Sequence, residues 1–104
     1  MKLENYIYGN WITGDGEGQQ LYNAVTGEPV ATATTKGLDF KQILEYGRMV
    51  GNPALRKMTF HERGNMLKAL ALHLRNHLDK FYAISYKTGA TKADSWVDIE
   101  GGIG

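Results

Sequence analysis

The hydrophobic pattern changes along the chain, from short apolar runs at the start to helical spacing after residue 38. Tyr6-Ile7-Tyr8 and Trp11-Ile12-Thr13 are aromatic and β-branched runs, which favour strands. The Gly9-Asn10 dipeptide between them suits a tight primed turn. Residues 5–13 are therefore predicted to form a β-hairpin.

Two further short strands are predicted at residues 21–25 and 30–34, joined by a turn at residues 26–29. The glycine-rich run at residues 14–18 is predicted to be a surface loop. Neither a Lys-Ser/Thr pair nor a helix follows it, as both would in a phosphate-binding loop. A lone hairpin is only marginally stable in water, so this β-rich part, residues 1–37, must pack against something.

The second part, residues 38–104, is predicted to be helical. Asp39-x-x-Gln42 is a capping pattern, and apolar residues follow it at helical spacing. This helix is predicted to end near Gly51, because Asn52-Pro53 should block its continuation. Residues 54–58 then read as a connector.

Three more helices are predicted from three further capping patterns. Thr59-x-x-Glu62 opens a helix over residues 60–75, and Asn76-x-x-Asp79 opens one that ends near Lys87, with Gly89 as its left-handed terminal residue. Thr91-x-x-Asp94 opens the last. The helix at 60–75 carries one apolar stripe, which consists of Phe60, Leu67, Leu70, Ala71 and Leu74. The fold class is thus α+β, a hairpin and short strands followed by about four helices.

Composition narrows the class of protein without identifying it. The chain has 104 residues, is 42% hydrophobic and carries a net charge of +1, so it fits one small domain without a basic surface for nucleic acid. It has no cysteine, which excludes disulfides and a thiol nucleophile among these residues. We expect no membrane association, because no window approaches about 18 apolar residues. The start is no signal peptide, which makes the cytoplasm the default location.

Two groups of titratable residues are candidate sites. His73 and His77 are four apart, a spacing that lets two imidazoles on one helix share a metal, but His61 is distant and no Glu lies between them. They are predicted to be solvated or capping residues. Asp94 and Asp98, with Glu100 nearby, could pair as acid and base. The favoured interpretation is acidic charge near a helix N-terminus.

Two other patterns are candidate ligand sites. The aromatic residues Tyr6, Tyr8, Trp11 and Tyr22 lack interleaved Lys and Arg, so burial against the helices is predicted rather than base stacking. No strand precedes Gly101-Gly102-x-Gly104, so it is no dinucleotide fingerprint. No catalytic, cofactor-binding or metal residue is assigned to this chain.

The ordered motifs resemble the beginning of the aldehyde dehydrogenase superfamily. Tyr6-Ile7-Tyr8-Gly9-Asn10-Trp11 stands where that family has Tyr-Ile-x-Gly-x-Trp, and Asn23-Ala24-Val25-Thr26-Gly27-Glu28 matches its Asn-x-x-Thr-Gly-Glu turn. Phe60 to Leu67 resembles its arginine-containing helix start, and Thr88-Gly89-Ala90-Thr91 its helix-ending turn. The resemblance covers nearly all of the chain. It implies that residues 1–104 are the N-terminal portion of an aldehyde dehydrogenase domain.

A narrower resemblance is to the bifunctional ring-opening dehydrogenases of phenylacetate catabolism, through residues 53–60 and 88–104. It implies a parent enzyme that oxidises a semialdehyde with NADP or NAD, and whose partners for these residues are its own Rossmann, catalytic and MaoC-like parts. A homo-oligomer is implied. Since the family's cysteine nucleophile, glutamate base and cofactor segment match nothing here, the 104 residues alone should be inactive. We expect a truncated, structural part of a longer protein.

Two alternatives stay open at this stage. The well-capped helices also suit a free-standing α+β binding or interaction module. The motifs also suit part of a generic semialdehyde dehydrogenase unrelated to phenylacetate.

Overall fold

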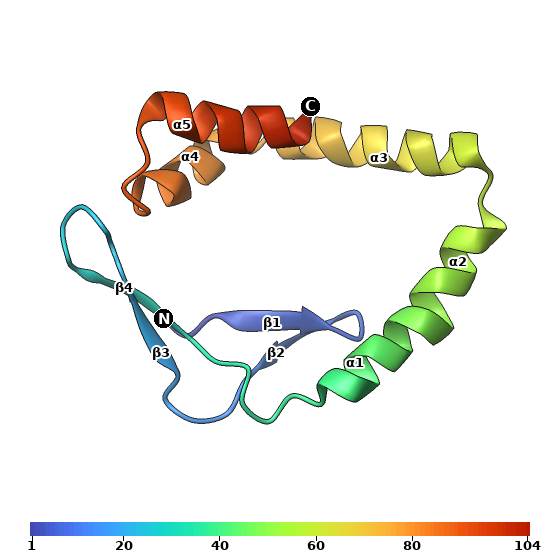
Figure 1. Ribbon diagram of the computed structural model, residues 1–104, viewed down its shortest axis with the longest axis horizontal. Helices are drawn as coiled ribbons and strands as arrows, with labels where there is room; N and C mark the ends of the chain where they lie inside the picture. Colours follow the sequence, from blue (N-terminus) through green and yellow to red (C-terminus); the bar gives the residue numbers. More distant parts are fainter. The chain divides into compact units, whose positions relative to one another are not determined.

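The computed structural model describes all residues, Met1–Gly104, which form two compact units. The first comprises Met1–Tyr22 and Glu28–Lys57, and the second comprises Asn23–Gly27 and Met58–Gly104. The α+β class is confirmed: two antiparallel hairpins are followed by four continuous helical segments (Figure 1). No helix combines the length and the apolar character needed to cross a membrane.

In the first unit, β1 (Glu4–Ile7) and β2 (Asn10–Thr13) form the predicted hairpin. Its turn, however, is Tyr8-Gly9 and not the predicted Gly9-Asn10. Tyr8 has φ 53° and Gly9 has φ 75°, the pair of positive values that a type I′ turn needs. Tyr8 tolerates this conformation because its ring meets Tyr46 edge-on, with centroids 5.5 Å apart, and its hydroxyl donates to the Asp39 carbonyl at 3.4 Å. Because Tyr46 and Asp39 are far from Tyr8 in the sequence, the residues next to Tyr8 do not indicate this turn.

The second hairpin pairs β3 (Gln19–Tyr22) with β4 (Pro29–Ala33), with Leu21 opposite Ala31. The predicted pairing is confirmed, although β3 begins and ends earlier than predicted. The other edge of β4 bonds the start of the chain: Leu3 N–H donates to the Thr32 carbonyl at 2.8 Å, and Thr32 N–H donates to the Met1 carbonyl at 2.9 Å. With partners on both edges, β4 is the centre of this unit, and its Ala31 is 3% exposed.

The glycine-rich loop at residues 14–18 lies against the segment that follows β4. Asp15 N–H donates to the Lys36 carbonyl at 2.9 Å, and the Thr34 hydroxyl donates to the Asp15 carbonyl at 3.0 Å. A Cβ on Gly14 would lie 2.4 Å from the Thr34 carbonyl oxygen. The predicted surface loop is therefore confirmed, and close backbone packing explains Gly14.

Replacing Gly14 by Ala is expected to destabilise the first unit by about 1–3 kcal/mol, because the backbone of residue 34 has to move to admit the methyl group. Gly47→Ala in the same unit is the matched control, since a Cβ there meets no atom within 4 Å. Urea unfolding of both variants checks this. Equal midpoints would contradict the close packing.

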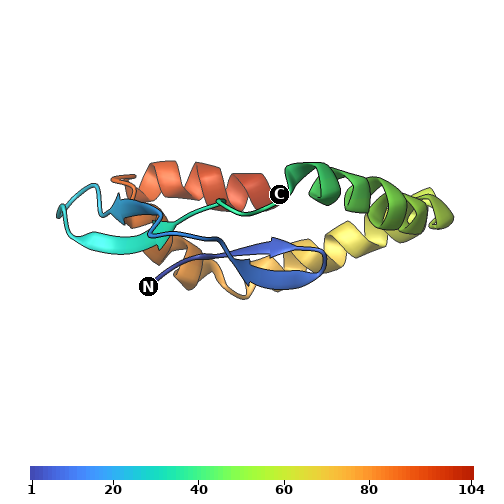
Figure 2. The ribbon, with the colours of Figure 1, turned by 90° about the horizontal axis from the view of Figure 1, so that it is seen from below.

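The first helical segment is longer than predicted. It joins α1 (Phe40–Tyr46), the π-helical turn η1 (Gly47–Gly51) and α2 (Asn52–Lys57) into one coil (Figure 2). Asp39 caps it as predicted, its Oδ1 accepting from Gln42 N–H at 3.0 Å. The predicted end near Gly51 and the connector at 54–58 are both wrong. Asn52 N–H reaches back five residues to the Gly47 carbonyl, and this wider turn admits Pro53, whose ring would clash in a regular α-helix.

The first helix of the second unit is α3 (Phe60–Arg75). Its predicted bounds and its predicted capping box are confirmed. Glu62 N–H donates to the Thr59 hydroxyl at 3.2 Å, and Thr59 N–H donates to the Glu62 carboxylate at 2.6 Å. These backbone and side-chain hydrogen bonds from Thr59 lower the pKa of Glu62.

The lowered pKa of Glu62 makes α3 acid-sensitive. A carboxyl whose pKa is lower in the folded state stabilises that state above its unfolded pKa, 4.5, and this stabilisation is lost as the pH falls through the folded value. Helicity by circular dichroism is expected to fall below pH 4.5 more in the wild type than in Glu62→Gln, which keeps the box but cannot titrate. Parallel acid titrations would contradict this.

The remaining helices are α4 (Leu78–Tyr86) and α5 (Lys92–Trp96), which continues into the π-helical turn η2 (Val97–Gly101). The predicted Asn76 N-cap is wrong: Asn76 is the C-cap of α3, and α4 begins after His77 without a side-chain cap. The Thr91 cap of α5 is confirmed, as is the left-handed Gly89, with φ 87°.

The turn Asn23–Gly27 belongs to the second unit because it bonds the end of α4. Ala24 N–H donates to the Lys87 carbonyl at 2.8 Å. The Asn23 side chain shapes the turn, its Oδ1 accepting from Val25 N–H at 2.9 Å and Thr26 N–H at 3.2 Å. The Asn-x-x-Thr-Gly-Glu motif thus has a structural role.

Candidate functional site

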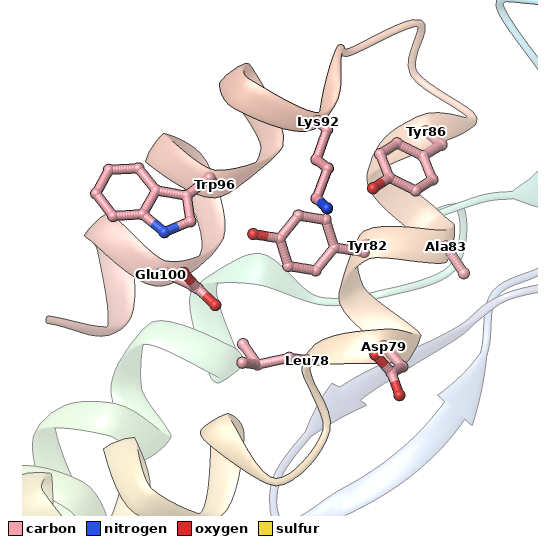
Figure 3. Close-up of a pocket in the computed structure, with 8 residues that line it drawn as sticks. All are labelled: Leu78, Asp79, Tyr82, Ala83, Tyr86, Lys92, Trp96 and Glu100. Atoms are coloured by element: carbon pink, nitrogen blue, oxygen red, sulfur yellow. The ribbon is translucent and has the colours of Figure 1, made fainter.

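A groove of about 570 Å³ lies between α4 and the α5–η2 helix, and we name it the α4–α5 groove (Figure 3). Tyr82 stands in its middle, with Trp96 and Glu100 on the facing helix and the Lys92 ammonium directed toward the Tyr82 ring. The lining residues are Leu78, Asp79, Tyr82, Ala83, Tyr86, Lys92, Trp96 and Glu100.

A serine pair holds the two helices together at this groove. The hydroxyls of Ser85 on α4 and Ser95 on α5 lie 2.8 Å apart, and Ser95 is 0% exposed. Small side chains allow the helix backbones to approach closely. Because each serine bonds the other rather than a base, neither is activated as a nucleophile. Sequence reasoning missed this pair, and nothing in the local sequence marks it.

Tyr82 lies in the α4–α5 groove, where its surroundings disfavour the ionised phenolate. Partial desolvation raises the pKa of Tyr82, and the charges of Glu100 and then Tyr86 raise it further. Tyr82 is therefore a neutral hydrogen-bond donor near pH 7. With the Lys92 cation and the Trp96 ring, the groove can bind polar and aromatic groups.

His73 and His77 lie together but not on one helix. His73 is in the last turn of α3, and His77 follows its end. Their ring centroids are 4.6 Å apart, and His77 Nδ1 lies 2.9 Å from the His73 carbonyl oxygen. This bond satisfies a terminal carbonyl of α3, in agreement with the capping role. No group of three or more potential metal ligands occurs in the chain.

Asp94 has the predicted place in the first turn of α5. Its N–H donates to the Thr91 hydroxyl at 3.2 Å, and its Oδ2 accepts from that hydroxyl at 2.8 Å. Asp98 lies in η2 and borders a separate hollow beside Leu74 and Phe81. The acid–base interpretation of the two carboxylates gains no support from these contacts.

The aromatic set is mostly exposed, so its predicted burial against the helices is wrong. Tyr6 and Trp11 are 61% and 65% exposed and pack on each other as a cross-strand pair, with ring centroids 5.0 Å apart. Tyr22 is also exposed, whereas the Tyr8 ring packs edge-on against Tyr46 of α1.

The residues of this chain do not fit a nicotinamide dinucleotide. The Gly101–Gly104 run lies at the end of a helical segment, whereas a dinucleotide cradle joins a parallel strand to a helix. Both two-stranded sheets are antiparallel, and no Gly-rich turn leads from a strand into a helix N-terminus.

Comparison with known proteins gives one informative similarity. The chain is 40% identical over 104 residues to a 3,4-dehydroadipyl-CoA semialdehyde dehydrogenase from Aromatoleum evansii, and the match covers 99% of this chain. No family model matches the sequence. The chain spans about a fifth of the length of that relative, 20%. It is therefore similar, along nearly its whole length, to one portion of a dehydrogenase.

Proposed function

We propose that this chain is a structural part of a longer bifunctional dehydrogenase that oxidises a semialdehyde carried on a CoA thioester in phenylacetate or related aromatic catabolism. The observation that carries the proposal is the 40% identity over 99% of the chain to a 3,4-dehydroadipyl-CoA semialdehyde dehydrogenase. In this proposal residues 1–104 support the fold, and the chemistry belongs to other parts of the longer protein.

Two observations on the chain favour a structural role over a catalytic one. Only Gly14, Ala31 and Ser95 are buried, so the chain holds almost no core of its own. The family nucleophile is a cysteine, and these residues include none. Burial of apolar surface is the dominant favourable term in folding, so such a chain gains much from further polypeptide.

We further propose that the longer enzyme uses NADP or NAD, that its cofactor is held by residues outside this chain, that it is a homo-oligomer, and that it works in the cytoplasm. The two nicotinamide cofactors differ by one phosphate. Residues 1–104 do not indicate which of them the enzyme uses, so an assay has to decide.

The test is an assay of the longer protein made from the natural gene. With 3,4-dehydroadipyl-CoA semialdehyde and NADP or NAD, we expect reduced cofactor to form, measured by its absorbance at 340 nm. A saturated, non-aldehyde CoA thioester is the control and should give no signal. A folded longer protein that reduces neither cofactor with this aldehyde would contradict the proposal.

A further inference from the structure

His73 and His77 bring two imidazole rings together at the junction of α3 and α4. Their ring centroids are 4.6 Å apart, and the ring planes are inclined by 44°. His73 is exposed and His77 is only partly buried, so both rings can be reached from solvent. Imidazole nitrogens are the commonest protein ligands of transition metals. The pair is therefore a candidate metal-binding group, and the proposed function makes no use of it.

A hydrogen bond fixes the tautomer of His77. Its Nδ1 lies 2.9 Å from the His73 carbonyl oxygen. Because a carbonyl oxygen can only accept, Nδ1 carries the proton, and the free lone pair of the neutral ring is on Nε2. Metal-ligating histidines are commonly held by such a bond from the other ring nitrogen to a backbone carbonyl, which orients the ring and raises its basicity. His77 thus has the arrangement of a metal ligand before any metal binds.

The separation of the two rings fits two bonds to one metal ion. A metal bound at about 2.0–2.1 Å from a ring nitrogen lies about 3.2 Å from the centroid of that ring. Two centroids 4.6 Å apart then correspond to an angle of roughly 90–100° at the metal. Adjacent ligands make such an angle in the square-planar and tetragonal sites of Cu²⁺ and Ni²⁺.

The end of α3 is also a favourable place for a cation. His73 lies in the last turn of α3, and His77 follows the C-cap. The C-terminal end of a helix carries a partial negative charge, which stabilises a cation there. Arg75, in the same last turn, is two residues from His73 and therefore points roughly 160° away from it around the helix axis. Its charge does not share the face of the His73 ring.

We propose that His73 and His77 together bind one divalent late transition-metal ion, Cu²⁺ most tightly, through one nitrogen of each ring. Cu²⁺ stands first because it has the highest affinity for nitrogen ligands among these ions. No group of three or more potential protein ligands occurs in the chain, so water or an external ligand completes the coordination. Mg²⁺ and Ca²⁺, which prefer oxygen ligands, are not expected to bind. This inference does not depend on the proposed function.

The test uses Cu²⁺–iminodiacetate and the protein made in full from its natural gene. This probe leaves adjacent positions open on the metal, so it selects a pair of imidazoles over a single one. We expect electron paramagnetic resonance to show one bound Cu²⁺ with two imidazole nitrogens per chain, and about a tenfold excess of Mg²⁺ over the probe to leave the spectrum unchanged. A protein that gives no such spectrum would overturn the proposal.

Variants then assign the bound probe to this pair. His73→Gln and His77→Gln are each expected to weaken binding by at least about tenfold, and the double variant no further, because the loss of either ring ends the chelation. His61→Gln is the matched control. His61 is exposed on the same helix but lies 12 residues before His73, about 18 Å along the axis, so its loss should leave the affinity nearly unchanged.

Two other results with the variants would overturn the proposal. Single variants that keep the affinity and lower only the number of bound ions would show two independent histidines. Equal weakening by His61→Gln would show that binding is not confined to the pair. If His77→Gln disturbs the junction because its ring bond is lost, His73→Gln decides, since it keeps the backbone carbonyl that the His77 ring bonds.

Discussion

The purified 104-residue chain should oxidise no semialdehyde, with either NADP or NAD, above the rate of the buffer. Aldehyde oxidation in the resembled family begins with attack by a cysteine thiolate, and this chain has none. Its fully buried serine bonds another serine, and no base activates either hydroxyl. Nor do its residues fit a dinucleotide. Relative to the longer protein, we expect a complete loss of semialdehyde oxidation.

The assay uses both cofactors at saturating concentration and the 3,4-dehydroadipyl-CoA semialdehyde. The matched control is the longer protein at equal molar concentration, so that an inactive substrate batch is recognised. Turnover by the pure 104-residue chain, surviving a second purification step, would contradict the assignment of a structural role.

A second large effect is expected in the association state of the isolated chain. With the α3 stripe in water, the chain should form oligomers whose mean mass rises with concentration, because exposed apolar patches adhere to one another. The contacts need not be specific. Leu67→Lys is expected to shift the distribution strongly toward the monomer, since Leu67 is on the stripe.

Static light scattering over a hundredfold range of concentration measures this. Leu72→Lys is the control, because it removes an equally apolar side chain from a different face of α3. A wild-type chain that stays monomeric at the highest concentration would contradict the expectation. An equal shift in both variants would show that association does not depend on the stripe.

Local signals in the sequence were sufficient for much of this fold. The reciprocal bonds of Thr59 and Glu62 need only four consecutive residues, and they gave the start of α3 correctly. The Thr91 cap and the left-handed Gly89 are local in the same sense. The first hairpin was predicted from its apolar runs.

The wrong predictions share a different cause, because each depended on contacts or turns that the local sequence does not specify. Tyr8 accepts a positive φ because Tyr46 and Asp39 hold its ring and hydroxyl. Pro53 fails to end its helix because η1 widens the turn before it. His77, rather than Asn76, precedes α4, and its ring bonds the His73 carbonyl.

The candidate sites were harder to predict than the elements. The α4–α5 groove depends on the close approach of Ser85 and Ser95, which lie in separate helices. The apolar stripe of α3 was visible in the sequence, but its exposure was not. Whether a stripe is buried depends on what else the molecule places against it.

The most direct test of the structural role is the intact mass of the protein that the natural host produces. If residues 1–104 are one part of a longer dehydrogenase, the mass should be about five times the 11.6 kDa of this chain, since the match spans 20% of the relative. A mass of 11.6 kDa would contradict the account. The chain would then be a free-standing module.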